Sequence, residues 1–422
     1  MSVSKWAVVV LGAALLWTPM EAAAQERPDS VKLAELERRM DAMTRELEQL
    51  RLGREVVQAD TSVLGLGPAA SKVYKVGQGV SLGGYGEILY ENYAGERQDG
   101  SPASARDQVD ALRAILYVGY KFNDRLLFNS EIEIEHVDEV FLEFAYVDYL
   151  LNDHVGLRSG LLLAPMGLVN ELHEPPTFLG TERAVTENAI IPTTWRENGI
   201  GLFGGVGDFA WRAYVLNGLN GAGFSGSGLR GGRQKGARAL AEDFGVAARL
   251  DYQGILGLLA GGSVYFGQSG QNAELEGQEV DAGTLIWDGH LDYNVGGLDL
   301  RALVAGAHVN DARELSALNG LTGANGIAES MLGWYVQAGY DVLRGTDLAD
   351  QLTPFVRYEQ VNTQRSVLEG FSANPANDRT ILTVGASWKP ITNVVWKTDY
   401  QMHSNLADLG TNQFNMALGW IF

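Results

Sequence analysis

Between residues 76 and 422 the chain alternates between apolar side chains and polar or very small ones, with a period of two. The segment 412–422 shows the pattern most clearly. One face carries Phe414, Met416, Leu418, Trp420 and Phe422, and the other carries Gln413, Asn415, Ala417 and Gly419. Because successive side chains of a β-strand point to opposite faces, the pattern predicts strands with one apolar and one polar face.

Sixteen segments of this kind follow one another, and the connections between them alternate in length. The predicted strands are 78–92, 109–122, 126–135, 140–151, 155–164, 195–205, 209–217, 243–252, 255–266, 284–293, 298–309, 330–340, 352–360, 379–390, 394–404 and 412–422. Connections at the end shared by both termini are mostly minimal, and those at the other end are mostly long. An even strand number with this asymmetry is typical of outer-membrane barrels. We therefore predict an all-β fold, a 16-stranded antiparallel transmembrane β-barrel, over 76–422.

Aromatic residues support the barrel, because outward positions near the short connections are where an interfacial girdle belongs. The candidates are Tyr120, Phe122, Tyr252, Tyr293, Tyr340 and Trp388, each of which taken alone also fits a core position. The last strand ends at Phe422 and resembles the C-terminal strand read by the outer-membrane assembly machinery. An ordinary edge strand is the alternative. The expected partners are outer-membrane lipid and this assembly machinery.

The first 24 residues have the three parts of a secretory signal peptide: Lys5, an apolar run from Trp6 to Trp17, and small residues before Gln25. Residues 25–52 carry apolar side chains at heptad spacing, namely Leu33, Leu36, Met40, Met43, Leu47 and Leu50. The spacing predicts a short coiled-coil helix that joins copies of the chain, or an amphipathic helix lying on its own domain. Residues 53–75 are interpreted as a linker.

Composition narrows the class of protein further. The chain has no cysteine, which excludes disulfides and cysteine-ligated metal sites. Its 32 basic and 52 acidic residues give a net charge of -20, so nucleic acid is not an expected partner. The 52 glycines favour strands and turns over long helices. We expect no cofactor and no catalytic residue.

Sixteen strands enclose a lumen that side chains cannot fill, so a water-filled channel is expected. The connection 165–194 is long and rich in proline, and we predict that it folds inward as the constriction. Its candidate constriction residues, with two from the start of the next strand, are Glu171, His173, Glu174, Glu182, Arg183, Arg196 and Glu197. His173 and Glu174 also fit a metal site, but hydrogen bonding of the loop to the wall is the simpler interpretation.

Inward positions of the predicted strands carry charges of both signs. The acidic ones are Glu131, Glu133, Glu135 and Glu143, and the basic ones are Arg113, Arg158, Arg212, Arg249, Arg301, Arg357 and Lys397. Rings of charged side chains in a pore select ions by the sign of their charge. Because this lumen carries both signs, the pattern does not decide between anion and cation preference. The connection 218–242 adds four basic residues, Arg230, Arg233, Lys235 and Arg238. They form either a basic funnel that attracts anions to the mouth of the channel or an ordinary solvated loop.

Two segments, GLLLAPMGLVNELHEPPTF at 160–178 and IIPTTWRENGIGLFGG at 190–205, resemble members of the phosphate-selective porin O and P family of Gram-negative outer membranes. The resemblance extends over about 76–422. It implies a homotrimer of sixteen-stranded barrels with an inward third loop, and phosphate as a solute.

The predicted function is that of a porin in the outer membrane of a Gram-negative-type bacterium. Ions and small solutes, anions such as phosphate among them, would diffuse passively past the loop 165–194. The alternative is a structural or adhesive barrel tethered to the periplasm or cell wall through its coiled coil. An outer-membrane enzyme built on His403, Ser404 and Asn405 is disfavoured, because adjacent strand residues face opposite sides.

Overall fold

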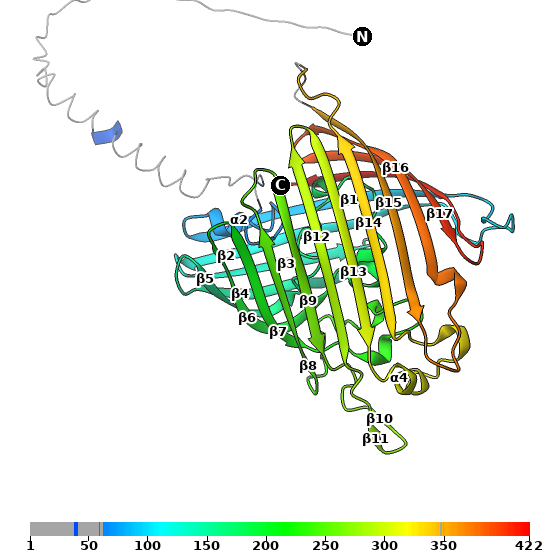
Figure 1. The fold of residues 1–422 in the computed structure, drawn as a ribbon. Coiled ribbons are helices and arrows are strands. Elements are labelled where there is room, and N and C mark those ends of the chain that lie inside the picture. Colours follow the sequence, from blue (N-terminus) through cyan, green and yellow to red (C-terminus); the bar gives the residue numbers. More distant parts are fainter. Residues whose placement is uncertain (1–37, 41–58, 60–61, 347, 349) are drawn as a thin grey trace, which may run out of the picture. The chain divides into compact units, whose positions relative to one another are not determined.

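Figure 1 shows the computed structural model of the chain, which describes residues 38–40, 59, 62–346, 348 and 350–422. The chain divides into two compact units, 1–56 and 57–422. Residues 38–40 of the first unit are helical, and the predicted signal peptide (1–24) and the rest of the predicted coiled coil (25–52) lie outside the described residues. None of the described helices is both long enough and apolar enough to cross a membrane.

The second unit contains a closed barrel of sixteen antiparallel strands, as the sequence predicts. β1 closes the barrel by pairing with β18, so that Ile88 lies opposite Leu418. The strands of the barrel are β1 (Gly79–Tyr93), β2 (Gln108–Asn123), β3 (Leu126–Glu135), β4 (Glu139–Leu150), β5 (Val155–Leu163), β6 (Arg196–Val206), β7 (Phe209–Asn217), β8 (Phe244–Tyr252), β9 (Leu258–Gly267), β12 (Thr284–Val295), β13 (Leu298–Val309), β14 (Ser330–Tyr340), β15 (Gln351–Ser366), β16 (Asp378–Ile391), β17 (Val394–Asn405) and β18 (Gln413–Ile421).

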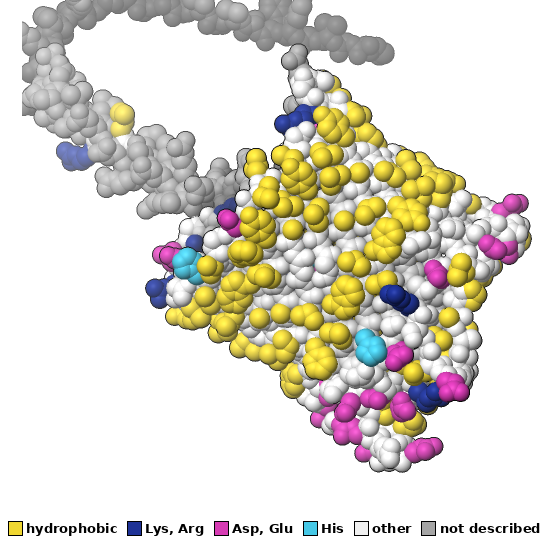
Figure 2. All heavy atoms as spheres, in the orientation of Figure 1, with side chains coloured by type: hydrophobic (Ala, Val, Ile, Leu, Met, Phe, Trp, Pro, Cys, Tyr) yellow, Lys and Arg dark blue, Asp and Glu magenta, His cyan; other side chains and the backbone are white. Residues whose placement is uncertain are grey.

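Apolar side chains cover the outer face of the barrel. In β18, Phe414 and Met416 are exposed, whereas Gln413 and Asn415 between them are buried. Figure 2 shows this apolar surface over the strands, with the acidic side chains of this face gathered mainly at its edges. Four of the predicted girdle aromatics are exposed, namely Tyr120, Phe122, Tyr340 and Trp388. The alternating pattern therefore places apolar side chains outside and polar ones in the lumen, as predicted.

The two ends of the barrel differ in their connections. At the short-turn end, tight turns such as 124–125, 207–208 and 392–393 join the strands, and 341–350 is longer. At the long-loop end, most connections are extended. They contain η1 (Pro175–Thr177) and α3 (Thr186–Ala189), η2 (Gly221–Gly223) and η3 (Arg230–Gly232), the hairpin of β10 (Glu274–Leu275) and β11 (Gln278–Glu279), α4 (Ala312–Leu318) and η4 (Gly323–Asn325), and η5 (Pro375–Asn377).

Two segments outside the strands contact the inner wall of the barrel. One is the inner loop, residues 165–194, in which Met166, Ile190 and Ile191 are fully buried. The other is the N-terminal segment, residues 62–75, which ends in α2 (Lys72–Lys75).

The sequence predicts a linker over residues 53–75, but the N-terminal segment within this range packs against the barrel and the inner loop. Leu66, Ala69 and Val73 are each 1% exposed. Glycine makes the close approach possible, because a Cβ atom at Gly67 would lie 2.3 Å from the carboxyl carbon of Glu174. The composition of this stretch resembles a linker, and its burial depends on a surface formed by distant residues.

Candidate functional site

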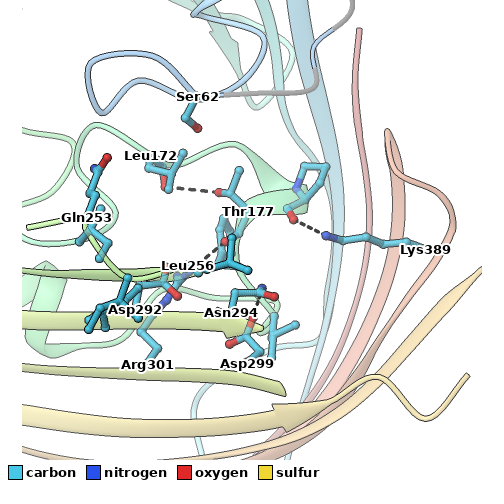
Figure 3. Close-up of a pocket in the computed structure, with 17 residues that line it drawn as sticks. Ser62, Leu172, Thr177, Gln253, Leu256, Asp292, Asn294, Asp299, Arg301 and Lys389 are labelled. Atoms are coloured by element: carbon cyan, nitrogen blue, oxygen red, sulfur yellow. Dashed lines mark hydrogen bonds and ion pairs between the residues drawn. The ribbon is translucent and has the colours of Figure 1, made fainter. Parts of the chain in front are cut away.

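Cations of the wall hold carbonyl groups of the inner loop. Lys389 Nζ of β16 donates to the Pro176 carbonyl at 2.7 Å, and Arg301 of β13 donates to the Thr177 carbonyl at 3.1 Å (Figure 3). Three further side chains of the wall donate to backbone carbonyls of the loop. Lys397 donates to the Gly180 carbonyl at 2.9 Å, Arg357 to the Glu182 carbonyl at 3.1 Å, and Arg249 to the Gly167 carbonyl. These strands therefore position the irregular backbone of the loop by its acceptor groups.

Carboxylates of the wall hold the N–H groups of the same loop. Asp399 of β17 accepts from the Thr181 backbone N–H at 2.7 Å and from its hydroxyl at 2.8 Å. Glu359 of β15 accepts from the N–H groups of Val185 and Thr186, at 3.0 and 2.9 Å. Buried backbone groups need a hydrogen-bond partner, and the wall supplies donors for the carbonyl groups of the loop and acceptors for its N–H groups. Much of the mixed inward charge is therefore used in anchoring the loop.

The predicted acidic patch on β3 and β4 faces His173, Arg113 and Arg196. Glu131 lies 3.3 Å from His173 Nε2 of the inner loop. Glu143 forms a buried ion pair with Arg196 of β6. Arg113 of β2 lies 3.8 Å from Glu133 and 3.5 Å from Glu87 of β1. The structure thus brings Glu131, Glu133, His173, Arg113 and Arg196 together around one side of the lumen.

A second cluster lies on β7, β8 and β12. Arg212 contacts Asp251 at 3.0 Å and Glu171 of the inner loop at 3.2 Å, and Arg249 contacts Asp251 at 2.8 Å. His290 joins the cluster, 2.8 Å from Asp251 and 2.6 Å from Asp288.

Within the part of the chain that the structure describes, no group of His, Asp and Glu side chains is arranged to hold a metal ion.

Two other predicted site residues have different partners. Arg158 pairs with Asp148 at 2.8 Å and donates to the hydroxyl of Tyr74, in the N-terminal segment, at 2.7 Å. Glu197 accepts from Asn217 and from the Gln234 N–H, each at 2.7 Å. Glu197 therefore supports the loop between β7 and β8.

Three titratable residues of the inner loop lie in different surroundings. Glu174 is 1% exposed and accepts hydrogen bonds from Ala69 and Ala70; burial raises its pKa to about 7. Glu182 accepts from Gln413 at 2.5 Å, and burial, followed by the charges of Glu91 and Asp399, raises its pKa to about 7. Burial, and then the charge of Arg113, lowers the pKa of Arg183.

Cavities lie on both sides of the inner loop. A cavity of about 660 Å³ at the short-turn end is lined by Pro176, Phe178 and the wall residues Asp292, Arg301 and Lys389 (Figure 3). A cavity of about 260 Å³ towards the long-loop end is lined by Phe178, Glu182, Arg183, Arg113 and Arg230. Phe178 borders both, and Lys397 Nζ lies 3.5 Å from the centre of its ring.

Sequence comparison places the chain beside one relative of similar length. The chain matches no family model. It is 37% identical over 390 residues to an uncharacterised protein of Aquifex aeolicus (strain VF5), covering 89% of this chain and 87% of that protein. The chain belongs to the family of this Aquifex protein. The aligned length includes most of the barrel.

The fold of this family member is similar to solved outer-membrane proteins. The structure matches OmpTdeltaL8, a loop L8 deletion mutant of OmpT of Vibrio cholerae, with a TM-score of 0.54 and 9% identity, covering 82% of this chain and all of that one. It also matches Salmonella typhi OmpF in complex with daunomycin, with a TM-score of 0.53 and 13% identity, covering 82% of this chain and 98% of that one. A third match is an anion-selective porin from Comamonas acidovorans, with a TM-score of 0.51 and 12% identity, covering 81% of this chain and 99% of that one. At these identities the similarity shows the fold alone, which is the porin-type barrel.

Several site residues of this family member are absent from the sequence-based candidates. They are Asp251, Asp288, His290, Glu359, Lys389 and Asp399. The period-two pattern carries a signal for them, because each lies at an inward strand position. The pattern does not reveal their partners, which are backbone groups of the inner loop for Asp288, Glu359, Lys389 and Asp399 and other wall side chains for Asp251 and His290.

Proposed function

We propose that the protein is an outer-membrane porin, a channel for the passive diffusion of ions and small solutes, narrowed by the inner loop 165–194. The observation that supports this most is the arrangement of the lumen. The closed sixteen-stranded barrel has an apolar outer face, and cavities lie on both sides of the inner loop, with Phe178 lining both. Such a barrel is wide enough to enclose an aqueous route.

The proposed route passes between charged groups of both signs. On the long-loop side, Arg183 and Arg230 border the cavity, and Arg230 Nη1 is buried without a hydrogen-bond partner among the described residues. On the short-turn side, Arg301 and Lys389 border the cavity together with acidic residues. We propose that anions such as phosphate are among the solutes, which the unpartnered Nη1 of Arg230 and the family resemblance of 160–178 favour.

The proposed setting is the outer membrane of a Gram-negative-type bacterium. The signal peptide would direct export, and the strand ending at the outward and exposed Phe422 would be read by the assembly machinery. We propose a homotrimer, joined by the heptads of 25–52. No enzymatic activity is proposed: His403 Nε2 lies 3.1 Å from Gln401, and the Ser404 hydroxyl donates to the Thr380 carbonyl at 3.2 Å, so neither contacts the other.

Single-channel recording of the refolded mature chain in a planar bilayer tests the proposal. We expect stepwise current, and the reversal potential under a KCl gradient gives the ion preference. An anion-directed reversal potential with block by added phosphate would support the anion proposal. Cation preference without phosphate block would retain the channel and remove phosphate as its solute.

A second candidate function is a structural or adhesive barrel tethered through the coiled coil. The observation that favours it is the N-terminal segment, which occupies part of the lumen together with the inner loop. The same recording separates the two functions, because a correctly folded barrel that carries no current would support the structural role.

A further inference from the structure

The N-terminal segment (62–75) contacts inward side chains near the short-turn ends of several strands. Asn129 Nδ2 of β3 donates to the Ala70 carbonyl at 3.0 Å, and Arg212 Nε of β7 donates to the Leu64 carbonyl at 3.2 Å. The Tyr74 hydroxyl donates to Asp148 of β4 at 2.7 Å. The segment is therefore fixed to the wall on the side from β3 to β7.

Glu174 joins this segment to the inner loop. Its carboxylate accepts from the backbone N–H of Ala69 at 3.0 and 3.1 Å and from that of Ala70 at 3.0 Å. Glu174 immediately precedes Pro175 and Pro176, which belong to η1, so the contact lies close to the cavity at Phe178. One side chain therefore links the N-terminal segment to the part of the loop that borders both cavities.

The segment also borders the open space at the short-turn end. Ser62 lines the cavity of about 660 Å³, where Figure 3 shows it across from Leu172 and Thr177. Ser62, Leu64 and Gly65 line a neighbouring cavity of about 530 Å³. Removing the segment from the wall would therefore enlarge both cavities and widen this mouth of the barrel.

We propose that the N-terminal segment is a plug that narrows the short-turn mouth of the channel, and that Glu174 is the latch that holds it. This inference rests on the proposed channel function. The docked plug gives a low-conductance state, and its release gives a high-conductance state.

Two glycines of the same region provide a matched pair of variants. In Gly67→Ala the new Cβ would lie 2.3 Å from the carboxyl carbon of Glu174, so the carboxylate must shift relative to the N–H groups that it binds, and we expect these hydrogen bonds to weaken. In Gly77→Ala the new Cβ meets no atom within 4 Å. Neither glycine has a positive φ angle, so neither change strains the backbone. We expect a several-fold rise in mean single-channel conductance for Gly67→Ala and wild-type conductance for Gly77→Ala.

A cross-link tests the direction of the effect within one molecule. A Cβ atom at Gly119 would lie 2.8 Å from Val73 Cβ, within about 1 Å of the Cβ spacing of a disulfide. The chain has no cysteine of its own, so Val73→Cys with Gly119→Cys gives a single defined pair. In the Gly67→Ala background, we expect oxidation to restore the low conductance and reduction to return the high one.

The outcomes separate this inference from the proposed function. Current through the wild type that is unchanged in Gly67→Ala and in a chain lacking 62–75 would overturn the plug and keep the channel. Absence of current from every folded variant would overturn both. If Gly67→Ala fails to fold, as judged by heat-dependent migration in gels, Glu174→Ala in the cross-linkable background replaces it. If the cross-linkable Glu174→Ala variant has the same conductance under oxidising and reducing conditions, that result would also overturn the proposed plug.

Discussion

At the scale of single residues, several of the inward charges of this barrel bind the backbone of the inner loop. Lys389 and Lys397 donate to loop carbonyls, and Asp399 accepts from a loop N–H. A loop without regular secondary structure cannot satisfy its own backbone groups, and an unpaired buried group costs about 1–3 kcal/mol. The balance of acidic and basic wall residues is therefore a poor guide to ion selectivity when it is read without their partners.

Phe178 lines both cavities, so its ring is expected to limit passage between them. Phe178→Ala should raise single-channel conductance and admit larger neutral sugars in a liposome-swelling assay. Phe371→Ala, in the connection between β15 and β16, is a suitable control, because Phe371 lines neither of these cavities. Equal conductance in wild type and Phe178→Ala would place the narrowest point elsewhere.

Glu174 predicts a pH dependence of the stability of the folded barrel. Burial is the main cause that raises the pKa of Glu174 from its ordinary 4.5 to about 7, His173 and Glu131 being the ionisable groups that face it. A raised pKa means that the folded barrel binds this proton more tightly than the unfolded chain does. The contribution of Glu174 to the free energy of unfolding is therefore complete below pH 4.5 and is lost as pH rises through 7.

The free energy of unfolding, measured by urea titration in detergent, should consequently fall between pH 5 and pH 8. Glu174→Gln keeps the side-chain volume and removes the titration, so this component should disappear in that variant. A pH profile that Glu174→Gln leaves unaltered would assign the dependence to another group.

At the scale of elements, the inner loop is attached to the wall on both of its flanks. His173 and Glu171 contact the side formed by β3, β7 and β8, and Thr181 and Thr186 contact β17 and β15. A segment fixed at several separate points is expected to be rigid even though it contains only short helices. The anchors therefore determine the shape of the proposed constriction.

Asp399→Ala should loosen this loop, because Thr181 would lose the acceptor for both its N–H and its hydroxyl. We expect a loss of about 1–3 kcal/mol in the free energy of unfolding, measured by urea titration in detergent, and noisier open-channel current. Asp281→Ala, at an exposed position beyond β11, is the control and should change stability by less than about 0.5 kcal/mol. Identical stability of the two variants would contradict the anchoring role of Asp399.

At the scale of the whole molecule, closure of the sheet is what allows an apolar exterior to surround a polar lumen. Pairing of β1 with β18 removes the free strand edges, so the barrel needs no external partner for its backbone. The apolar exterior then matches lipid, and the lumen retains the charged groups.

An outward charge in the middle of a strand should therefore be costly in a bilayer. Val336 of β14 is 48% exposed on the outer face, and Val336→Arg should destabilise the folded barrel in liposomes by about 2–4 kcal/mol. Val342→Arg, just beyond the short-turn end of β14, has the same starting exposure and should cost little. Equal costs for the two substitutions would argue against a membrane around β14.

The number of strands, their antiparallel order and the outward or inward direction of each side chain were determined by the sequence alone. They follow from a local rule, the period of two, together with alternating short and long connections, as in β3 and β18. Candidates such as Glu131 and Arg212 were identified because strand direction places their side chains in the lumen.

Tertiary structure decided what those side chains contact. The pairing of Asp399 with Thr181 and of Glu174 with Ala69 joins residues separated by 218 and 105 positions. No local pattern encodes such pairs, because each depends on how two irregular segments fill the space inside a closed barrel. For the same reason the burial of the N-terminal segment, which has the composition of a linker, became visible only in the folded molecule.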